Sequence, residues 1–376
     1  MKIINYGKQY LDNKDYNEVK KVLKLDVITR GKFVNQFEKK ISNLVNSKFS
    51  IVCNSGSSAL FLSFLALNLK SGDNVIMPAV NFIASYNSAV FFGANIYLAD
   101  VDKNTGQMTP NNVKECIKKF NIKKLKIILT QYHGGYPENI YEFYRLKKKY
   151  NCKIIEDACH SFGASYKHKN KIYKIGSCVH SDLCTFSFHP LKTITTGEGG
   201  AITTNSKKLK ELLIQFRSNG IIKDKKFNWI SKSNKIGFNF NLTDFQCALG
   251  LSQLTKINIF LRKRKVIYDY YKKNLNNLKK FKLIEYKKNI FPSYHLFFLH
   301  LKNASLKAKK KFFNYMRKNK INVMYHYIPI YKFKSFKGKY IGRNSNKYFL
   351  SSVSLPIYYS LNKNQQKYII KKIKAF

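Results

Sequence analysis

The feature that most constrains the fold is a regular alternation of short apolar runs with helical stretches in the first half of the chain. The runs have the length of strands and cover residues 50–53, 74–77, 95–98, 125–130 and 153–156. Stretches with helical spacing, such as PNNVKECIKKF and ENIYEFYRLKKKY, separate several of them. Alternating strands and helices favour a mainly parallel sheet with helices on both faces. The sequence therefore predicts an α/β fold.

The rest of the chain predicts the domain organisation. The expected elements are an N-terminal arm with a helix at 13–25, a second helix at 33–46, two short strands at 184–190 and 199–205, a long helical region at 243–275, a strand at 294–301, a helix at 306–319, a strand at 321–327 and a terminal helix. We expect a large domain over residues 1–245, arm included. Residues 246–376 then hold the long linking helix and a smaller α+β domain.

The chain is strongly basic, with 69 Lys and Arg against 20 Asp and Glu and a net charge of +49. Basic proteins often bind nucleic acid or anionic surfaces. Only seven of the basic residues are Arg, however, and the lysines are spread over the whole chain. Arg is the side chain suited to bidentate recognition of phosphates and bases. The charge therefore predicts solvated faces rather than a nucleic-acid site, although it also favours anionic cofactors and substrates.

The cysteines and the apolar segments bear on location. The seven cysteines are scattered and form no CxxC pair, so they indicate neither a disulfide framework nor a zinc site. The N-terminus has no apolar signal region, and no run approaches the 18 or so apolar residues of a membrane span. These features predict a protein of the reducing cytoplasm, without a metal site or a membrane segment.

Four segments carry groups suited to chemistry. The turn NSGSS at 54–58 precedes an apolar helix, whose free N–H groups would bind a phosphate, although an ordinary Ser-capped helix fits equally. Asp157 ends a buried strand, where parallel sheets bind ligands, or else caps the next helix. Lys192 follows an apolar strand among hydroxyls and glycines, as a Schiff-base lysine requires. The loop GFNFNLTD at 237–244 precedes the long helical region.

Together these segments resemble the DegT/DnrJ/EryC1/StrS family of sugar aminotransferases, over essentially the whole chain. The most specific match is FSFHPLKTITTGEGGAITTN, the Schiff-base segment of that family. Other matching segments are NSGSSAL, Pro78 with Asn81 and Phe82, Glu156-Asp157 with His160, Ser293-Tyr294-His295, His326-Tyr327-Ile328-Pro329 and Ser354-Leu355-Pro356. The resemblance implies a fold-type I, pyridoxal-phosphate-dependent transferase.

The resemblance also implies roles for individual residues in the cofactor site. Lys192 would form the Schiff base and move the proton during transamination. Asp157 would pair with the pyridinium nitrogen, His160 would lie near the phenolic oxygen of the ring, and Phe82 would stack on the ring face. The backbone amides of Ser57 and Ser58 and the Ser187 hydroxyl would hold the phosphate.

Further matches concern the partners of the site. Asn239 would reach the phosphate of the neighbouring subunit's cofactor, so the resemblance implies a homodimer with shared sites. The predicted substrate-binding residues are Tyr6, Thr29, His326 and Tyr331. The family's substrates imply a nucleotide sugar and glutamate as partners.

Some members of the family carry His at the Schiff-base position and act as dehydratases, so Lys192 favours transamination. Within the family, the segments at 187–205, 248–254 and 326–331 are most similar to the pseudaminic-acid branch. That branch aminates C4 of a UDP-linked 4-keto-6-deoxy-N-acetyl hexose. Bacillosamine, legionaminic-acid and perosamine types remain alternatives, and so does a basic nucleic-acid-binding protein on this fold. Asn241, where many relatives have Arg, leaves the details of substrate binding open.

Overall fold

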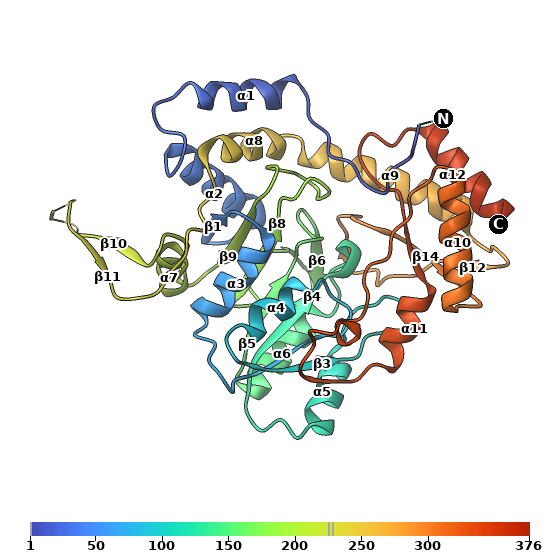
Figure 1. Ribbon diagram of the computed structural model, residues 1–376, viewed down its shortest axis with the longest axis horizontal. Helices are drawn as coiled ribbons and strands as arrows, with labels where there is room; N and C mark the ends of the chain where they lie inside the picture. Colours follow the sequence, from blue (N-terminus) through green and yellow to red (C-terminus); the bar gives the residue numbers. More distant parts are fainter. Residues whose placement is uncertain (1, 225, 228) are drawn as a thin grey trace.

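The computed structural model describes residues 2–224, 226–227 and 229–376 and centres on an eight-stranded sheet (Figure 1). The strand order is β1-β9-β8-β5-β4-β2-β3-β15. The strands are β1 (Phe49–Cys53), β2 (Asn74–Pro78), β3 (Asn95–Ala99), β4 (Leu125–Gln131), β5 (Lys153–Asp157), β8 (Leu183–Ser187), β9 (Gly200–Thr204) and β15 (Lys339–Tyr340). From β8 to β15 all neighbours pair in parallel, whereas β9 is antiparallel to both β8 and β1. The predicted mainly parallel α/β fold is confirmed.

Helices lie on both faces of this sheet, as the alternation in the sequence predicts (Figure 1). The helices of this part of the chain are α1 (Asn13–Leu23), α2 (Lys32–Val45), α3 (Gly56–Ala66), α4 (Ala84–Val90), α5 (Pro110–Lys119), α6 (Ile140–Tyr150), α7 (Lys207–Arg217), α8 (Asp244–Leu254) and α9 (Ile257–Leu275), with a short 3-10 turn η1 (His133–Gly135). Of these, α1 packs on α8, and α9 packs against a helix of the last third of the chain. Local signals set their ends: Thr109 and Asn112 form a reciprocal capping box at the start of α5. The predicted long helical region is interrupted at Thr255 and Lys256, between α8 and α9.

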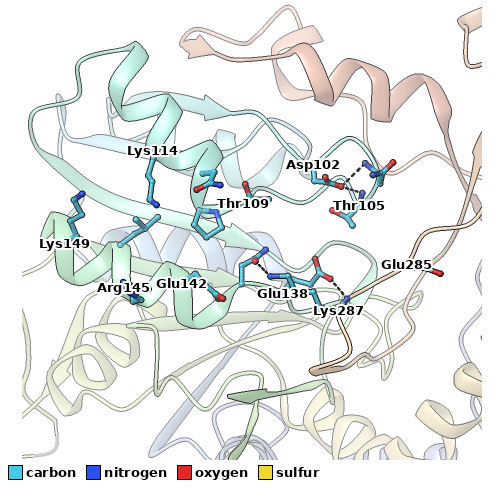
Figure 2. A pocket seen from close by; sticks show the side chains of 15 residues that line it. Asp102, Thr105, Thr109, Lys114, Glu138, Glu142, Arg145, Lys149, Glu285 and Lys287 are labelled. Carbon is cyan, nitrogen blue, oxygen red and sulfur yellow. Dashed lines mark hydrogen bonds between the residues drawn. The ribbon is translucent and has the colours of Figure 1, made fainter. Parts of the chain in front are cut away.

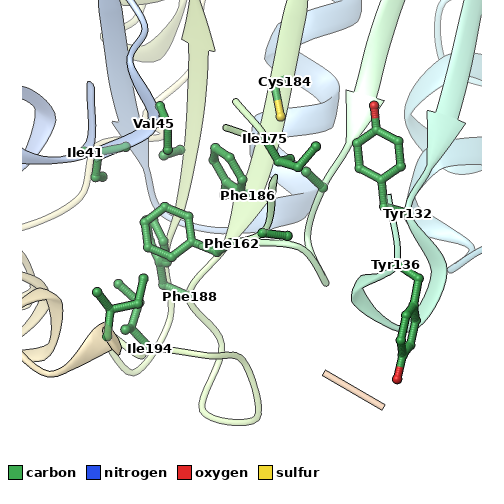
Figure 3. Packing of buried hydrophobic residues seen from close by; sticks show 14 of the residues in the cluster. Ile41, Val45, Tyr132, Tyr136, Phe162, Ile175, Cys184, Phe186, Phe188 and Ile194 are labelled. Atoms are coloured by element: carbon green, nitrogen blue, oxygen red, sulfur yellow. The ribbon is translucent and has the colours of Figure 1, made fainter. Parts of the chain in front are cut away.

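Alternate side chains of the fully buried strand β8 serve two separate cores. Cys184 and Phe186 join the cluster that includes Phe37 of α2, whereas Leu183 joins the cluster that includes Phe64 of α3. Figure 3 shows the first cluster, in which the Phe162 ring meets the Phe186 ring edge-on at a centroid distance of 4.9 Å. A strand buried on both faces is rigid, so its carboxyl end is a firm support for a site.

The last third of the chain forms a smaller antiparallel sheet with helices beside it. The elements are β12 (Phe281–Lys282), β14 (Phe297–Leu301), β16 (Ser352–Leu355), α10 (Leu306–Lys318), η2 (Ile330–Lys332), α11 (Arg343–Ser351) and α12 (Lys363–Ala375), in the strand order β12-β14-β16. The strand predicted at 321–327 is wrong. Ile321 and Met324 make only isolated bridges, to Ile4 and Ser354, and β16 occupies the place beside β14.

Two short strands tie this last third to the preceding part of the chain, β15 in the large sheet and β13 (Ile290–Phe291) in a separate three-stranded sheet. β15 pairs with β3, and β13 pairs with β6 (Ser165–His168), which in turn pairs with β7 (Lys171–Lys174). The division after residue 245 therefore stays a prediction. A hairpin of β10 (Ile221–Lys223) and β11 (Ser231–Ser233) projects from the body beside α7 (Figure 1). Among the described residues, no helix is both long and apolar enough to cross a membrane.

Candidate active site

A cavity of about 530 Å³ lies where the carboxyl ends of β5 and β8 meet the first turn of α3. Parallel strands place ligands at this edge of a sheet. Eight of the residues predicted from the sequence line it: Tyr6, Ser57, Phe82, Asp157, His160, Ser187, Lys192 and His326. They come from positions 6 to 326 of the chain, so only the fold brings them together.

Asp157 is the last residue of β5 and is almost fully buried. Its Oδ1 accepts a hydrogen bond from the Cys159 backbone N–H at 3.2 Å. Burial raises the pKa of Asp157, while the Cys159 N–H and the charge of Lys192 oppose that rise. A carboxylate held in this way needs a cationic partner in the cavity to remain ionised, which a protonated ring nitrogen would provide.

Lys192 lies on the loop between β8 and β9, and backbone hydrogen bonds fix the shape of that loop. Phe188 N–H donates to the Gly199 carbonyl at 2.8 Å, and Thr196 N–H donates to the Phe188 carbonyl at 3.0 Å. Burial lowers the pKa of Lys192, and the negative charge of Asp157 opposes this. A lysine with a lowered pKa has a larger fraction of free amine, the form that attacks a carbonyl carbon.

The start of α3 forms a cradle with Ser187. Ser55 caps the helix by accepting from the Ser58 N–H at 3.0 Å, and the Ser58 hydroxyl donates to Asn54 Oδ1 at 2.6 Å. A Cβ on Gly56 would lie 2.8 Å from Ser187 Cβ, so the backbone and Ser187 approach closely only because residue 56 is glycine. Free N–H groups at a helix start beside a hydroxyl form an anion site. Ser58 itself does not line the cavity, because its amide and hydroxyl serve the cap.

Histidines crowd the opposite wall of the cavity. The His160 ring lies 4.3 Å from the His295 ring, centroid to centroid, and His160 Nε2 lies 2.9 Å from the Tyr327 hydroxyl. His326 Nδ1 lies 2.8 Å from the Ser354 hydroxyl. Burial lowers the pKa of all three histidines, and the charge of Lys192 lowers it further. The imidazoles are therefore neutral at pH 7 and act as hydrogen-bonding and stacking groups.

Besides Ser58, three predicted site residues lie outside the cavity of the single chain. Thr29 is exposed and bridges to Thr243, and Asn239 is exposed and accepts from Asn241 Nδ2 at 2.9 Å. The Tyr331 hydroxyl donates to the Gly342 carbonyl at 3.1 Å, and its ring stacks on the exposed ring of Tyr340. Thr29 and Asn239 therefore lie on the surface of the single chain, whereas the Tyr331 hydroxyl is bonded to the Gly342 carbonyl.

Several residues that line or support the cavity were not predicted from the sequence. Gln131, Glu198, His295 and Tyr327 line it, and Arg264 lies directly behind Lys192. His295 and Tyr327 fall within segments that match the family, and that was the available signal for them. No comparable signal marked Arg264, which is one basic residue within the run RKRK.

A second, larger hollow of about 800 Å³ lies between α5 and α6, and it contains none of the predicted site residues. Figure 2 shows both cations and carboxylates along its walls, among them Arg145 and Glu142 of α6. Glu138 accepts from the Lys287 N–H at 2.8 Å at one end. The charged side chains of this hollow are of both signs and are largely solvated, so they do not form a set of groups suited to catalysis. Across the described residues, no cluster of His, Cys, Asp or Glu could hold a metal ion.

Comparisons with known proteins agree with this geometry. A model of the DegT/DnrJ/EryC1/StrS aminotransferase family matches residues 9–374. UDP-4-amino-4,6-dideoxy-N-acetyl-beta-L-altrosamine transaminase of Campylobacter jejuni subsp. jejuni serotype O:23/36 (strain 81-176) is 34% identical over 371 residues, 98% of this chain and 96% of that protein. GDP-perosamine synthase of Escherichia coli O157:H7 is 29% identical over 93% of this chain and 92% of that protein.

A solved structure matches over the full length. Helicobacter pylori PseC, an aminotransferase involved in the biosynthesis of pseudoaminic acid, superposes with a TM-score of 0.89 and 26% identity, covering 100% of both chains. The similarity therefore extends over the large sheet, the smaller sheet and the cavity between them.

Proposed function

This chain belongs to the DegT/DnrJ/EryC1/StrS aminotransferase family, and on that premise we propose that it transfers the amino group of glutamate to C4 of a UDP-linked 4-keto-6-deoxy-N-acetyl hexose, a pseudaminic-acid precursor. Membership makes the chain a pyridoxal-phosphate-dependent nucleotide-sugar aminotransferase. The proposal depends on one observation: Lys192, Asp157 and the start of α3 face a single cavity.

The residues of the cavity fit pyridoxal phosphate. The first turn of α3 has free backbone N–H groups, and the close approach of Gly56 to Ser187 brings them beside the Ser187 hydroxyl, where a phosphate would bind. Phe82, 52% exposed in the single chain, offers a ring face to the cofactor. Asp157 lies at the strand end, where it would hold a proton on the ring nitrogen. When bound, the cofactor supplies an electron sink that lets an amino group move between two carbon skeletons.

The chain's own groups then perform binding and proton transfer. Lys192 would hold the cofactor through its amine, and once released in each half-reaction that amine would take a proton from one carbon and return it to another. Burial lowers the pKa of Lys192, which raises the fraction of free amine at a given pH. Asp157 would pair with the ring nitrogen of the cofactor. His160, held by Tyr327 and Gly134, would help to orient the ring.

The identity of the sugar rests on the relatives. The altrosamine transaminase is more similar to this chain, at 34% identity, than the perosamine synthase, at 29%. Histidine and tyrosine side chains from 325–327 and the Tyr6 ring line the outer cavity, where a sugar would lie. The difference between the two relatives supports a UDP-linked acetamido sugar, with a GDP-linked sugar as the alternative.

We further propose that the active enzyme is a homodimer. Apolar side chains gather on the projecting hairpin and near residue 28, and Trp229, the only tryptophan, is 77% exposed. Asn239 and Thr29 lie on the exposed surface of one chain, yet the family resemblance gives both a place in a site. A second copy that covers this surface would bury the apolar groups and bring Asn239 to the neighbouring cavity.

The first experiment tests transamination. We expect the purified protein with pyridoxal phosphate to show a visible absorbance band that glutamate bleaches, because the cofactor takes up the amino group. Lys192→Ala should bind the cofactor weakly and fail to turn over, whereas Lys207→Ala, at an exposed lysine, should behave as wild type. A protein that shows no band after reconstitution would contradict the assignment of this cavity.

A second experiment separates the sugars. The glutamate-treated enzyme is mixed with UDP-linked and GDP-linked 4-keto-6-deoxy sugars, and return of the visible band is followed. We expect the UDP-linked acetamido sugar to restore the band at least tenfold faster. Preference for the GDP-linked sugar would replace the pseudaminic-acid proposal with the perosamine type and leave the aminotransferase assignment intact.

A third experiment tests shared sites. We expect Lys192→Ala and Asn239→Ala each to be inactive or impaired as pure proteins. If each site uses Lys192 of one chain and Asn239 of the other, mixed dimers contain one intact site, so activity should rise to about a quarter of wild type on mixing. Absence of complementation in a mixture that forms dimers would show that each chain's site is independent.

A further inference from the structure

Arg264 of α9 is a buried guanidinium that is held by carbonyl groups. Only 4% of its surface is exposed. Its Nη1 donates to the Ile357 carbonyl at 2.9 Å, to the His295 carbonyl at 3.2 Å and to the Tyr294 carbonyl at 3.5 Å. Arg264 forms no ion pair with any carboxylate in the part of the chain that the structure describes.

An unpaired buried charge is costly to a fold. Carbonyl dipoles repay only part of the lost hydration of a guanidinium. Burial lowers the pKa of Arg264 to about 10, which still leaves the group charged at neutral pH. A buried cation without a carboxylate partner, such as Arg264, is therefore expected to act on the groups that it faces.

Arg264 and the lysine loop line the same small cavity. Lys192, Thr193, Ile194 and Thr195 contribute to it from the loop, and of these only Lys192 also lines the main cavity. The charge of Arg264 is one of the causes that lower the pKa of Lys192. Its His295 contact also joins it to the wall of the site, because the His295 ring packs against the His160 ring.

We propose that Arg264 is a positioning residue of this active site: its positive charge, fixed by three carbonyl groups, lies at the small cavity that Lys192 also lines and disfavours a second positive charge on the lysine amine. The free amine is the form that captures the cofactor and accepts a proton during transamination. The inference requires only that Lys192 binds the cofactor, and it holds whichever sugar the enzyme takes.

Other groups around Lys192 act in both directions. Asp157, at the end of β5, favours the protonated amine, and Arg264 disfavours it from α9. His189 on the lysine's own loop, and the wall histidines His160, His295 and His326, are also close enough to feel the charge of Lys192. Burial depresses the pKa of these histidines, so none of them carries a competing charge at pH 7 and above.

The test measures the protonation of Lys192 directly, in the full chain freed of cofactor. Trace acetylation across a range of pH, read by mass spectrometry of the Lys192 peptide, gives the pH at which half of the amine is free. Arg264→Gln should raise this midpoint by about one pH unit, the order expected when one nearby unit charge is removed. Arg264→Lys keeps the charge and should remain near wild type.

Matched controls separate charge from packing. Arg262→Gln removes the same charge from the exposed face of α9 and should leave the Lys192 midpoint unchanged. An unchanged midpoint in Arg264→Gln would overturn the proposal, and so would an equal shift in Arg264→Lys, because loss of packing would then be the cause.

If Arg264→Gln does not fold, Gln9→Glu decides. Gln9 is exposed at the same small cavity, so a carboxylate there should raise the midpoint. No shift in that variant would also overturn the proposal.

The same variants give an independent reading in the holoenzyme. Bleaching of the visible absorbance band by glutamate requires no sugar. The pH dependence of this bleaching reports the environment of the linkage between Lys192 and the cofactor. A sugar screen that fails while the labelling midpoint moves as expected would contradict the proposed substrate and leave the role of Arg264 standing.

Discussion

The Tyr327 hydroxyl lies 2.9 Å from His160 Nε2, and the two side chains come from positions 167 residues apart in the chain. On the other side of the ring, the Gly134 backbone N–H donates to His160 Nδ1 at 3.2 Å. Because Nδ1 accepts, the proton of the neutral imidazole is on Nε2, which donates to Tyr327. The ring is thus fixed in one tautomer and one orientation at the wall of the cofactor cavity.

Removal of this contact should impair catalysis more than stability. Tyr327→Phe leaves the ring in place and frees His160 Nε2, so the imidazole can rotate. A lost hydrogen bond of about 1 kcal/mol predicts a fall in kcat of roughly five- to tenfold. Steady-state kinetics with glutamate and the preferred sugar measure the effect. Tyr340→Phe, at a half-exposed tyrosine away from the cavity, is the control, and equal losses in both variants would contradict the role given to Tyr327.

Much of this architecture could be predicted from the sequence, because the central strands are continuous apolar runs. The predicted strands at 153–156 and 74–77 agree with the observed β5 and β2 to within one residue. A strand that is buried on both faces appears in the sequence as a continuous run of apolar residues. The segment 321–327 has an equally strand-like composition, yet it pairs only at single bridges because β16 occupies the sheet position it would need.

The site was only partly predictable for a related reason. Lys192 and Asp157 lie next to local signals, a glycine-rich loop and a strand end. Arg264 lies in the run RKRK, where neighbouring basic residues are exposed, and only the packing of α9 shows which one faces inward. Contacts between residues far apart in the chain, such as that of Tyr327 with His160, leave no trace in either local sequence.

The phosphate cradle depends on the missing side chain at residue 56. Gly56→Ala would place a Cβ 2.8 Å from Ser187 Cβ, so α3 and β8 would have to separate. We expect a loss of about 1–3 kcal/mol in stability and a cofactor affinity at least tenfold weaker. Ser187→Ala keeps its Cβ and removes only a hydroxyl, so it should weaken binding less. Titration of each cofactor-free protein with pyridoxal phosphate compares them, and wild-type affinity in Gly56→Ala would refute the cradle.

The buried histidines should make the fold sensitive to acid. Burial lowers the pKa of His133 to about 4 and the pKa of His160, His295 and His326 well below the ordinary value of 6.5. Below pH 6.5 the unfolded chain therefore binds protons that the folded chain does not. Stability is complete above that pH and falls as the pH decreases, by about 2 kcal/mol for each histidine at pH 5.

Urea unfolding between pH 8 and pH 5 measures this loss as a falling midpoint. Burial also lowers the pKa of His300, to about 3, and His300 lies outside the cavity with Nδ1 2.9 Å from the Ser351 hydroxyl. His300→Phe keeps the ring volume and removes one titrating group, so its midpoint should fall less steeply with pH than that of wild type. A wild-type midpoint that stays constant from pH 7.5 to pH 5.5 would show that these histidines do not govern acid stability.

Lys309 of α10 provides the opposite case, a buried base whose removal should stabilise the protein. Only 5% of its surface is exposed, its Nζ donates to the Phe349 carbonyl, and burial lowers its pKa to about 7. Between pH 7 and pH 10.5 the unfolded chain binds a proton that the folded chain releases, so this lysine costs stability at neutral pH and less as the pH rises. Lys309→Met fills the same space without a charge. We expect a gain of about 2 kcal/mol at pH 7, after allowing for the lost hydrogen bond, that shrinks towards zero near pH 10.

Chemical denaturation at both pH values, with Lys310→Met as the exposed neighbour on the same helix, checks this expectation. The control variant should change the unfolding free energy by less than about 0.5 kcal/mol at either pH, because its ammonium is already in water. A gain in Lys309→Met that is independent of pH would mean that added apolar packing, and not the discarded charge, stabilises the variant. Methionine can reproduce neither the hydrogen bond of Lys309 to the Phe349 carbonyl nor its cation–π contacts with Phe349 and Phe313. A loss of stability at pH 7 would therefore mean that these contacts outweigh the cost of burying the ammonium.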